Sequence, residues 1–377
     1  MRCRAGAGAE VVVASVAQML ARYQNAGIPT AMSRLLAWPL LLCVAVACHG
    51  VGPRGDVTPD ASWDVRMVAP GVSLRGLCVV DEQVVWASGT QGTVLRSTDG
   101  GASWQSVGPA GVVALDFRDV HGFDEERAVI CSAGQPARVY RTDDGGARWQ
   151  LVHEDTRSAA FFDALAFLDA DNGLLYADPI DGRANMYTTA DGGRSWSLLP
   201  QTSVPEPLEG EAAFAASGTC VLAGDGCFWV ATGGRVTRLF SSADAGGTWS
   251  VAALPLLHGR ASTGAFSLAF ADALHGVVVG GDYRQPGIGA GTAAMTDDGG
   301  ISWVASPVGA GGYRSGVTFV PGAGAYVAVG SHGCSLSLDG GWTWRELSAE
   351  GFHAVGSSGE GRVWAVGSEG RVAQLRL

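Results

Sequence analysis

Aspartate residues recur along this 377-residue chain at a nearly regular spacing, each inside the same eight-residue motif. The motif reads [ST]-x-D-x-G-x-x-W and occurs six times, with its aspartates at Asp99, Asp144, Asp191, Asp244, Asp298 and Asp339. Such carboxylates could bind calcium, but no single motif supplies the roughly six to eight oxygen ligands that calcium takes. An Asp beside Ser or Thr and Gly instead favours a turn in which the carboxylate accepts backbone N–H groups. We therefore expect these six residues to hold turns.

The other fixed positions of this box motif support the same interpretation. The Gly can adopt a positive φ, and the closing Trp is expected to begin a strand and to bury its ring. Short apolar runs that end in small residues lie between the motifs, as in 84–89 (VVWASG) and 326–330 (YVAVG). The motifs are spaced by 45, 47, 53, 54 and 41 residues. Four strands in a repeat of this length are typical of a β-propeller blade.

The two ends of the chain complete the count of blades. Residues 352–377 supply three strands without a box motif, and residues 62–70 supply one strand before the first repeat. One blade built from both termini would close the ring and remove open sheet edges. The sequence therefore predicts an all-β fold, a seven-bladed β-propeller over residues 62–377.

Composition restricts the kinds of ligand that this chain can bind. It has 25 Lys and Arg against 36 Asp and Glu, a net charge of −11, and no basic run. Nucleic-acid binding needs a positive surface, which an acidic chain lacks. Zinc-site and serine-hydrolase signatures are missing, and the GxGxxG match at 50–55 follows no strand and opens no helix. We expect a monomer that binds no nucleic acid, no metal and no cofactor.

The N-terminal residues have the pattern of an export signal. Arg34 precedes an apolar stretch, 35–47, that is too short to span a bilayer comfortably. The stretch ends in small residues before Cys48, as in bacterial lipoproteins, where the Cys is lipidated; the alternative is ordinary cleavage near Ala47. The protein would then be an envelope lipoprotein, attached to the membrane by its lipid alone, or otherwise be secreted.

This interpretation divides the N-terminal region into three segments. Residues 1–31 would be an extension from a misassigned start codon, 32–48 the signal peptide and 49–61 a tether. Within the propeller, Cys220 and Cys227 flank a short turn, and an exported protein could carry a disulfide between them.

The six motifs, the seven blades and the export signal together resemble the photosystem II stability/assembly factor family over residues 62–377. The motif corresponds to the Asp box, or BNR repeat. The resemblance implies a propeller that acts as a binding or assembly scaffold. Sialidases and sortilin-type receptors share the Asp box, so the motif identifies the blade and not the activity. Sialidases usually have six blades and an Arg-Ile-Pro motif, which is absent from this sequence.

The expected functional surface is the end of the propeller opposite the box motifs. Loops between second and third strands and connections between blades form that end, and binding residues are often found on such loops. Polar residues begin several inner strands, and they differ between blades while the box motifs repeat. The candidate binding residues are Arg75, Asp163, Asp178, Asp181, Glu211, Asp282, Tyr283, Arg314 and His353.

Three interpretations of these candidates remain open: solvated channel residues and internal ion pairs, a binding surface, or a catalytic site. In the catalytic version Arg75, Arg314 and Arg284 surround an anionic substrate, with Asp163 or Glu211 as acid or base. Our first hypothesis is a scaffold for a protein or acidic carbohydrate partner in the envelope. The alternative is a sialidase-like glycoside hydrolase acting on an acidic sugar. We expect Arg75 and Arg314 to face one shared cavity.

Overall fold

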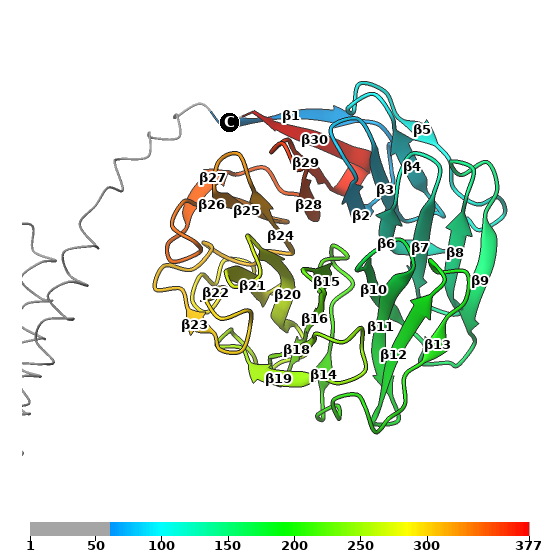
Figure 1. The fold of residues 1–377 in the computed structure, drawn as a ribbon. Coiled ribbons are helices and arrows are strands. Elements are labelled where there is room, and N and C mark those ends of the chain that lie inside the picture. Colours follow the sequence, from blue (N-terminus) through cyan, green and yellow to red (C-terminus); the bar gives the residue numbers. More distant parts are fainter. Residues whose placement is uncertain (1–60, 377) are drawn as a thin grey trace, which may run out of the picture. The chain divides into compact units, whose positions relative to one another are not determined.

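Seven antiparallel sheets arranged in a ring make up the part of the chain that the structure, a computed structural model, describes, residues 61–376 (Figure 1). The predicted all-β, seven-bladed propeller is therefore confirmed. The predicted signal, the candidate lipidation site Cys48 and nearly all of the predicted tether fall in residues 1–60, outside the described residues.

Each blade has four strands, which run in order from the innermost to the outermost. Blade 1 contains β2 (Leu74–Val79), β3 (Val85–Gly89), β4 (Val94–Ser97) and β5 (Gln105–Ser106); blade 2 contains β6 (Asp116–Gly122), β7 (Ala128–Ala133), β8 (Ala137–Thr142) and β9 (Gln150–Asp155). Blade 3 contains β10 (Phe162–Phe167), β11 (Asn172–Ile180), β12 (Arg183–Ala190) and β13 (Ser197–Leu198); blade 4 contains β15 (Val221–Gly224), β16 (Cys227–Ala231), β18 (Arg238–Ser242) and β19 (Ser250–Ala253). Blade 5 contains β20 (Thr263–Phe270), β21 (Gly276–Asp282), β22 (Ala293–Thr296) and β23 (Val304–Ala305); blade 6 contains β24 (Gly316–Val320), β25 (Ala325–Gly330), β26 (Gly333–Ser337) and β27 (Arg345–Ser348).

Blade 7 joins the two ends of the propeller. Its strands are β28 (Ala354–Ser357), β29 (Val363–Val366), β30 (Arg371–Arg376) and β1 (Ser62–Met67). The outermost strand β1 pairs with β30 from Ser62 opposite Arg376 to Met67 opposite Arg371, so the ring closes as predicted. Two short strands, β14 (Glu211–Ala212) and β17 (Gly233–Gly234), extend the sheet of blade 5, and a 3-10 turn η1 (Ser368–Gly370) precedes β30.

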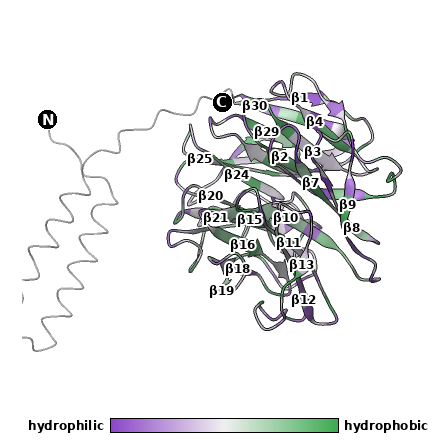
Figure 2. Ribbon diagram, turned by 45° about the vertical axis from the view of Figure 1, so that its right-hand side comes forward, coloured by the Kyte–Doolittle hydropathy of each residue, from purple (hydrophilic) through white to green (hydrophobic). Residues whose placement is uncertain are grey.

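The hydrophobic core lies between neighbouring blades. Second strands such as β3, β7 and β25 are buried along their whole length, whereas the outer strands β5, β13 and β23 are exposed. One cluster joins blades 2 and 3 through Val129, Phe162, Leu175 and the box tryptophan Trp196. Figure 2 shows this gradient, with green along the inner strands and purple in the outer strand β1. Apolar burial between blades therefore holds each sheet against the next.

All six box aspartates close turns between the third and fourth strands. In the third box, Gly193 donates its N–H to Thr189 Oγ1 at 2.9 Å, and Thr189 donates its hydroxyl to Asp191 at 2.7 Å. Ser195 donates its N–H to the same carboxylate at 2.9 Å. The other five boxes repeat this pattern. Hydrogen bonds from the Ser103 hydroxyl and N–H lower the pKa of Asp99 to about 2, as expected for an ionised turn acceptor.

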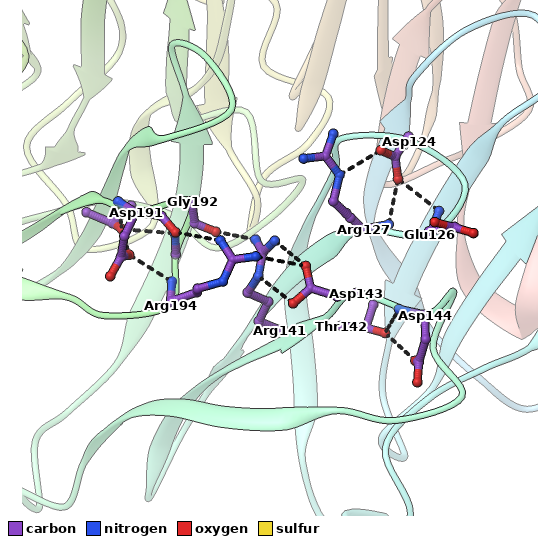
Figure 3. A network of polar contacts seen from close by, with 12 residues as sticks. Asp124, Glu126, Arg127, Arg141, Thr142, Asp143, Asp144, Asp191, Gly192 and Arg194 are labelled. Atoms are coloured by element: carbon purple, nitrogen blue, oxygen red, sulfur yellow. Dashed lines mark hydrogen bonds and ion pairs between the residues drawn. The ribbon is translucent and has the colours of Figure 1, made fainter.

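Arginine side chains connect neighbouring blades at the box end. Arg141 on β8 is buried, pairs with Asp143 and donates to the Gly192 carbonyl in the next blade's box (Figure 3). Arg96 on β4 likewise donates to the Glu125 carbonyl of blade 2 at 2.6 Å. These bonds satisfy turn carbonyls and fix the spacing between blades.

The candidate disulfide between Cys220 and Cys227 is not present, since both side chains are free thiols. The Cys220 carbonyl, just before β15, accepts the N–H of Ala231, while Cys227 lies at the turn, opposite Gly224. The two cysteines therefore lie at opposite ends of the same hairpin.

Within residues 61–376, no helix has the length and apolar character needed to cross a membrane. Over the same residues, no group of three or more His, Cys, Asp or Glu side chains is placed to hold a metal ion.

Candidate functional site

A β-bulge interrupts the innermost strand of several blades at the same place. In blades 1, 2, 3 and 5 the register shifts by one residue, which leaves Arg75, Arg118, Asp163 and Phe266 as the extra residues. Bulges re-aim side chains and often occur beside binding sites. Each of these bulges precedes the second half of its strand, away from the turn that contacts the box. We call this end of the channel, opposite the boxes, the channel mouth.

Blades 6 and 7 place Ser315 and His353 at the equivalent position. The N–H of Ser315 donates to the Val329 carbonyl, although Val329 already pairs with Gly316. The N–H of His353 donates to the Val366 carbonyl in the same way. Each of these blades therefore places one residue at the equivalent position of the channel mouth, and the residue type differs from blade to blade.

Among these channel-mouth residues, Arg75 has the side chain most free to bind a ligand. Its guanidinium is half-buried and has no ion pair or hydrogen-bond partner among residues 61–376. Burial and then the charge of Arg118 lower the pKa of Arg75, whereas Asp116 and Tyr313 act in the opposite direction. Because these neighbours come from blades 2 and 6, the Arg75 guanidinium lies at the centre of the ring.

His353 adds a neutral imidazole beside Arg75. Its Nδ1 lies 3.1 Å from the Leu74 carbonyl, so Nδ1 carries the proton and Nε2 remains an acceptor. Burial, and then the charge of Arg75, lower the pKa of His353 to about 4. The imidazole is therefore uncharged at neutral pH.

Arg118, by contrast, already has partners for its guanidinium. Its Nε donates to Asp116 at 2.7 Å, and its Nη1 donates to the Ala215 carbonyl at 2.8 Å. Asp116 keeps one oxygen, Oδ1, buried and without a partner among the described residues. Arg118 thus holds a loop of blade 4 in place at the mouth.

Asp163 and Asp178 form a buried carboxyl pair in blade 3. Asp163 is fully buried, and Asp178 is the one described residue within hydrogen-bonding reach of its carboxyl group. Burial, and then the nearby Asp178, raise the pKa of Asp163 well above its usual range. Burial also raises the pKa of Asp178 to about 6, although Asp178 accepts the Ala213 N–H at 3.1 Å. Burial therefore disfavours the ionised form of Asp163 more strongly than that of Asp178.

A segment of blade 4 lies at the channel mouth and contacts the inner strands of neighbouring blades. Residues 213–218, which we call the channel plug, occupy the place of the first half of an inner strand, because β15 begins only at Val221. Phe214 of the plug stacks on Phe266 with ring centroids 3.8 Å apart. The rings of Phe266 and Tyr313 pack edge to face, with their centroids 4.8 Å apart. Tyr283, 45% exposed, covers the outer side of this aromatic cluster.

The structure brings some of the predicted residues together at this mouth. Arg75, Asp163, Asp178 and His353 lie around the channel plug, and Tyr283 lies at its edge. The candidate binding residues predicted from the sequence do not include Asp116, Arg118 or Tyr313. Arg118 could have been found by aligning the inner strands, since it occupies the same repeat position as Arg75.

Other predicted residues have structural roles instead. Glu211 is buried and pairs with Arg238 and with the Thr232 hydroxyl. Asp282 accepts the Arg284 N–H at 2.9 Å, which closes a local turn. Asp181 occupies the turn between β11 and β12 with a φ of 51°.

Arg314 differs most from expectation. Its guanidinium is buried and donates to Ser335 Oγ, at 2.8 and 3.0 Å, and to the Tyr313 carbonyl. Ser335 lies on β26, the third strand of blade 6, so the guanidinium points into the blade and away from the channel. The expectation that Arg75 and Arg314 face one cavity is wrong, because Ser335 satisfies Arg314 inside its own sheet.

A cavity of about 420 Å³ lies at the other end of the channel, toward the boxes. Apolar side chains of the inner strands line it, among them Leu77, Leu268, Val317 and Val355. The hydroxyls of Thr318 and Ser357 in its wall bond to each other at 3.0 Å. The two ends of the channel therefore differ: the mouth holds the channel plug, and the box end holds the cavity.

No model of a known protein family matches the chain, and no curated protein matches it in sequence. Solved structures do resemble it. "YCF48 from Cyanidioschyzon merolae" aligns with a TM-score of 0.61 at 18% identity, covering 84% of this chain and 99% of that one. "YCF48 bound to D1 peptide" aligns with a TM-score of 0.55 at 15% identity, covering 86% and 96%. The WD40 propeller domain of Doa1 aligns with a TM-score of 0.53 at 13% identity, covering 83% and 96%. At these identities the likeness establishes the β-propeller fold.

Proposed function

We propose that this protein is an exported binding scaffold of the cell envelope, similar in role to a photosystem II assembly factor. Its channel mouth holds a carboxylate-bearing segment of a protein partner. The observation that carries the proposal is Arg75, a half-buried guanidinium with no partner among the described residues. A guanidinium presents donors in a fork that matches a carboxylate, and this contact is stronger where water is partly excluded.

The surroundings of Arg75 suit such a segment. Neutral His353 offers an acceptor at Nε2, and exposed Tyr283 offers an aromatic surface with a hydroxyl. The channel plug leaves less room for a ligand inside the channel, because Phe214 stacks on Phe266 of blade 5 and the Ala215 carbonyl accepts a hydrogen bond from Arg118 of blade 2. An extended peptide lying across the mouth therefore fits better than a small molecule enclosed in the channel. The likeness to a propeller described as bound to a D1 peptide supports a protein segment as the ligand.

The alternative, a glycoside hydrolase, is favoured by one observation: burial raises the pKa of Asp163, which lies beside the second carboxyl group of Asp178. General acids of glycosidases have raised pKa values of this kind. Asp163 is fully buried, however, and cannot contact a glycosidic bond without movement of the plug. We expect no turnover on a panel of sialosides and uronides. Turnover that Asp163→Asn abolishes would establish the hydrolase instead.

Partner capture from the native envelope tests the scaffold. Tagged wild-type protein, Arg75→Ala and the control Arg148→Ala are cross-linked in cells, purified and compared by quantitative mass spectrometry. Arg148 is an exposed box-end arginine whose side chain makes no hydrogen bond or ion pair among the described residues. We expect at least one envelope protein to be retained by wild type and by Arg148→Ala and depleted at least tenfold with Arg75→Ala. Identical partner sets for the three proteins would contradict the proposal.

Export and anchoring are part of the same proposal. Lipidation of Cys48 would attach the propeller to a membrane, so Cys48→Ala should move the protein from the membrane fraction to the soluble envelope fraction. Unchanged membrane association of Cys48→Ala would exclude the lipid anchor and leave ordinary export as the alternative.

A further inference from the structure

The box motifs of blades 5 and 6 differ from the others at one exposed position. Three residues after the box aspartate, blades 1 to 4 have Ala102, Ala147, Arg194 and Gly247. Blades 5 and 6 have Ile301, 80% exposed, and Trp342, 46% exposed. Neither is the box tryptophan of its blade, which is Trp303 or Trp344. The fold therefore does not require large apolar side chains at these two positions.

A second repeated position in blade 5 shows the same change. In blades 1, 2, 3 and 5, a backbone carbonyl in the turn between first and second strands accepts the N–H of a box glycine. The residues that supply this carbonyl are Gln83, Glu126, Asp171 and Leu274. Three of them are polar, whereas Leu274 is apolar and 53% exposed. Blade 5 thus exposes a second large apolar side chain where its equivalents are hydrophilic.

Hydrogen bonds and packing place these residues on one surface. Gly299 donates its N–H to the Leu274 carbonyl at 2.9 Å, which joins the turn of Leu274 to the box of Ile301. The blade 6 box packs on blade 5, where Gly341 lies against Val277 and Met295. Ser306 donates its hydroxyl to the Gly341 carbonyl at 2.6 Å. Leu274, Ile301 and Trp342 are therefore exposed at the box end of two neighbouring blades, and we call these three side chains the apolar patch.

Acidic side chains surround the apolar patch. They are Asp272, Asp297, Asp298 and Asp339, from the same turns and boxes. Backbone N–H groups of Leu274 and His275 lower the pKa of Asp272 to about 2, and the hydroxyl and N–H of Ser302 do the same for Asp298. In blade 5, between Thr263 and Ala305, the only basic residue other than His275 is Arg284, which lies in the loop after β21, at the mouth end. In blade 6, exposed Arg345 begins β27 three residues after Trp342, so the four carboxylates outnumber the basic side chains near the patch. The rim of the patch is thus negatively charged at neutral pH.

We propose that this apolar patch is a second docking surface, for a basic amphipathic segment of a protein partner. Exposed Trp and Ile side chains supply the apolar contact area typical of the centre of an interface. The acidic rim attracts Arg and Lys residues that flank the apolar side chains of such a segment. The same rim repels anionic lipid headgroups and a second copy of this surface, which leaves the basic segment as the complementary ligand. This proposal does not depend on the channel mouth.

A random peptide library displayed on phage tests the proposal without a known partner. The target is wild-type protein, with counter-selection against a triple patch variant, Leu274→Ser, Ile301→Ser and Trp342→Ser. The matched control carries Gln83→Ser, Ala102→Ser and Ala147→Ser, the same replacement at the equivalent positions of blades 1 and 2. Thermal unfolding of all three proteins confirms folding; if the triple variant is unstable, Ile301→Ser alone replaces it, because that side chain is 80% exposed.

We expect enriched peptides to combine aromatic or aliphatic residues with a net positive charge. Synthetic copies should bind wild type and the control equally, bind the patch variant at least tenfold more weakly, and lose affinity as salt increases. Arg75→Ala should leave this binding unchanged, which separates it from the channel mouth. The proposal is overturned if no peptide depends on the patch or if the enriched peptides are acidic. It is also overturned if the patch mediates binding to phosphatidylglycerol vesicles or self-association in sedimentation experiments.

Discussion

Asp163 is a carboxyl group in an environment that disfavours its ionised form. It is buried at a bulge, and Asp178 is the one described residue within hydrogen-bonding reach of its carboxyl group. Arg118 offsets this only partly, since its guanidinium is bonded to Asp116 and Ala215. A group with a native pKa above its unfolded value takes up protons on folding. The free energy of unfolding should therefore fall as pH rises above the unfolded pKa of about 3.9.

Replacing Asp163 with Asn should remove this dependence. The amide has the same shape and cannot ionise, so Asp163→Asn should gain stability relative to wild type as pH rises from 4.5 to 8. Urea unfolding at several pH values measures the difference between the two proteins. Asp181→Asn, in an exposed turn, is the control and should give a curve parallel to that of wild type. A constant difference between Asp163→Asn and wild type over this range would show that Asp163 ionises in the native state as it does in the unfolded chain.

The box residues make a second prediction at this scale. Trp196 is 8% exposed and packs against Phe167 at 5.8 Å between ring centroids. Trp196→Ala should therefore lower the free energy of unfolding by about 3–5 kcal/mol, as large core truncations do. Asp191→Ala should cost about 1–3 kcal/mol, because the N–H donors of its turn lose their acceptor. Urea unfolding measures both values. Loss of partner capture by Asp191→Ala at unchanged stability would show that the box has a binding role.

The polar residues of the mouth show which roles of single side chains can be predicted from the sequence. Arg75 and Arg314 both begin inner strands with charge, and the sequence treats them alike. In the structure Arg314 is satisfied by Ser335, while Arg75 has no partner among the described residues. Which arginine is available depends on a contact between residues 21 positions apart, in the third strand of the same blade. A single sequence does not reveal such pairings.

At the scale of the strand, close contact between innermost strands limits side-chain size. A Cβ on Gly76 of β2 would lie 2.9 Å from Asp119 Cα on β6 and would also clash with Ser88 Oγ. The small residue lets two neighbouring blades approach at the channel. Asp119 itself ties blade 2 to blade 3 by accepting the Leu165 N–H at 2.8 Å.

Gly76→Ala should therefore lower the free energy of unfolding by about 1–3 kcal/mol through overpacking. Gly359→Ala is the matched control, because a Cβ there meets nothing within 4 Å and its φ is not in the positive region. The control should stay within about 0.5 kcal/mol of wild type. Equal urea midpoints for the two variants would show that the inner strands are less tightly packed than the structure indicates.

The strands of the propeller could be predicted better than its irregularities. Alternating apolar runs and box motifs indicated four strands per blade and the closure by β1, because these patterns repeat. The bulges and the channel plug do not follow from pattern. A bulge adds one residue to a strand without any marker in the sequence. The residues of the channel plug around Phe214 are as apolar as an inner strand, so the sequence does not distinguish the two.

At the scale of the whole molecule, the two ends of the channel differ in chemistry. The mouth holds the channel plug and Arg75, whereas the box end has an apolar cavity of about 420 Å³ and the apolar patch. The sequence pattern predicts the functional surface at the mouth alone, because the box motif at the other end repeats from blade to blade. The pattern does not single out the variable positions of the box, such as those of Ile301 and Trp342, because they lie between the fixed residues of the motif.

Site-specific photo-cross-linking from the channel mouth tests the central claim most directly. Tyr283 is 45% exposed at the edge of the mouth, so p-benzoylphenylalanine can replace it with little change of shape. The account predicts that this probe forms an adduct with an envelope protein in cells. The adduct should be lost when Arg75→Ala is added and kept when Arg148→Ala is added. Absence of an adduct from position 283, or an adduct that persists in Arg75→Ala, would contradict a partner-binding mouth centred on Arg75.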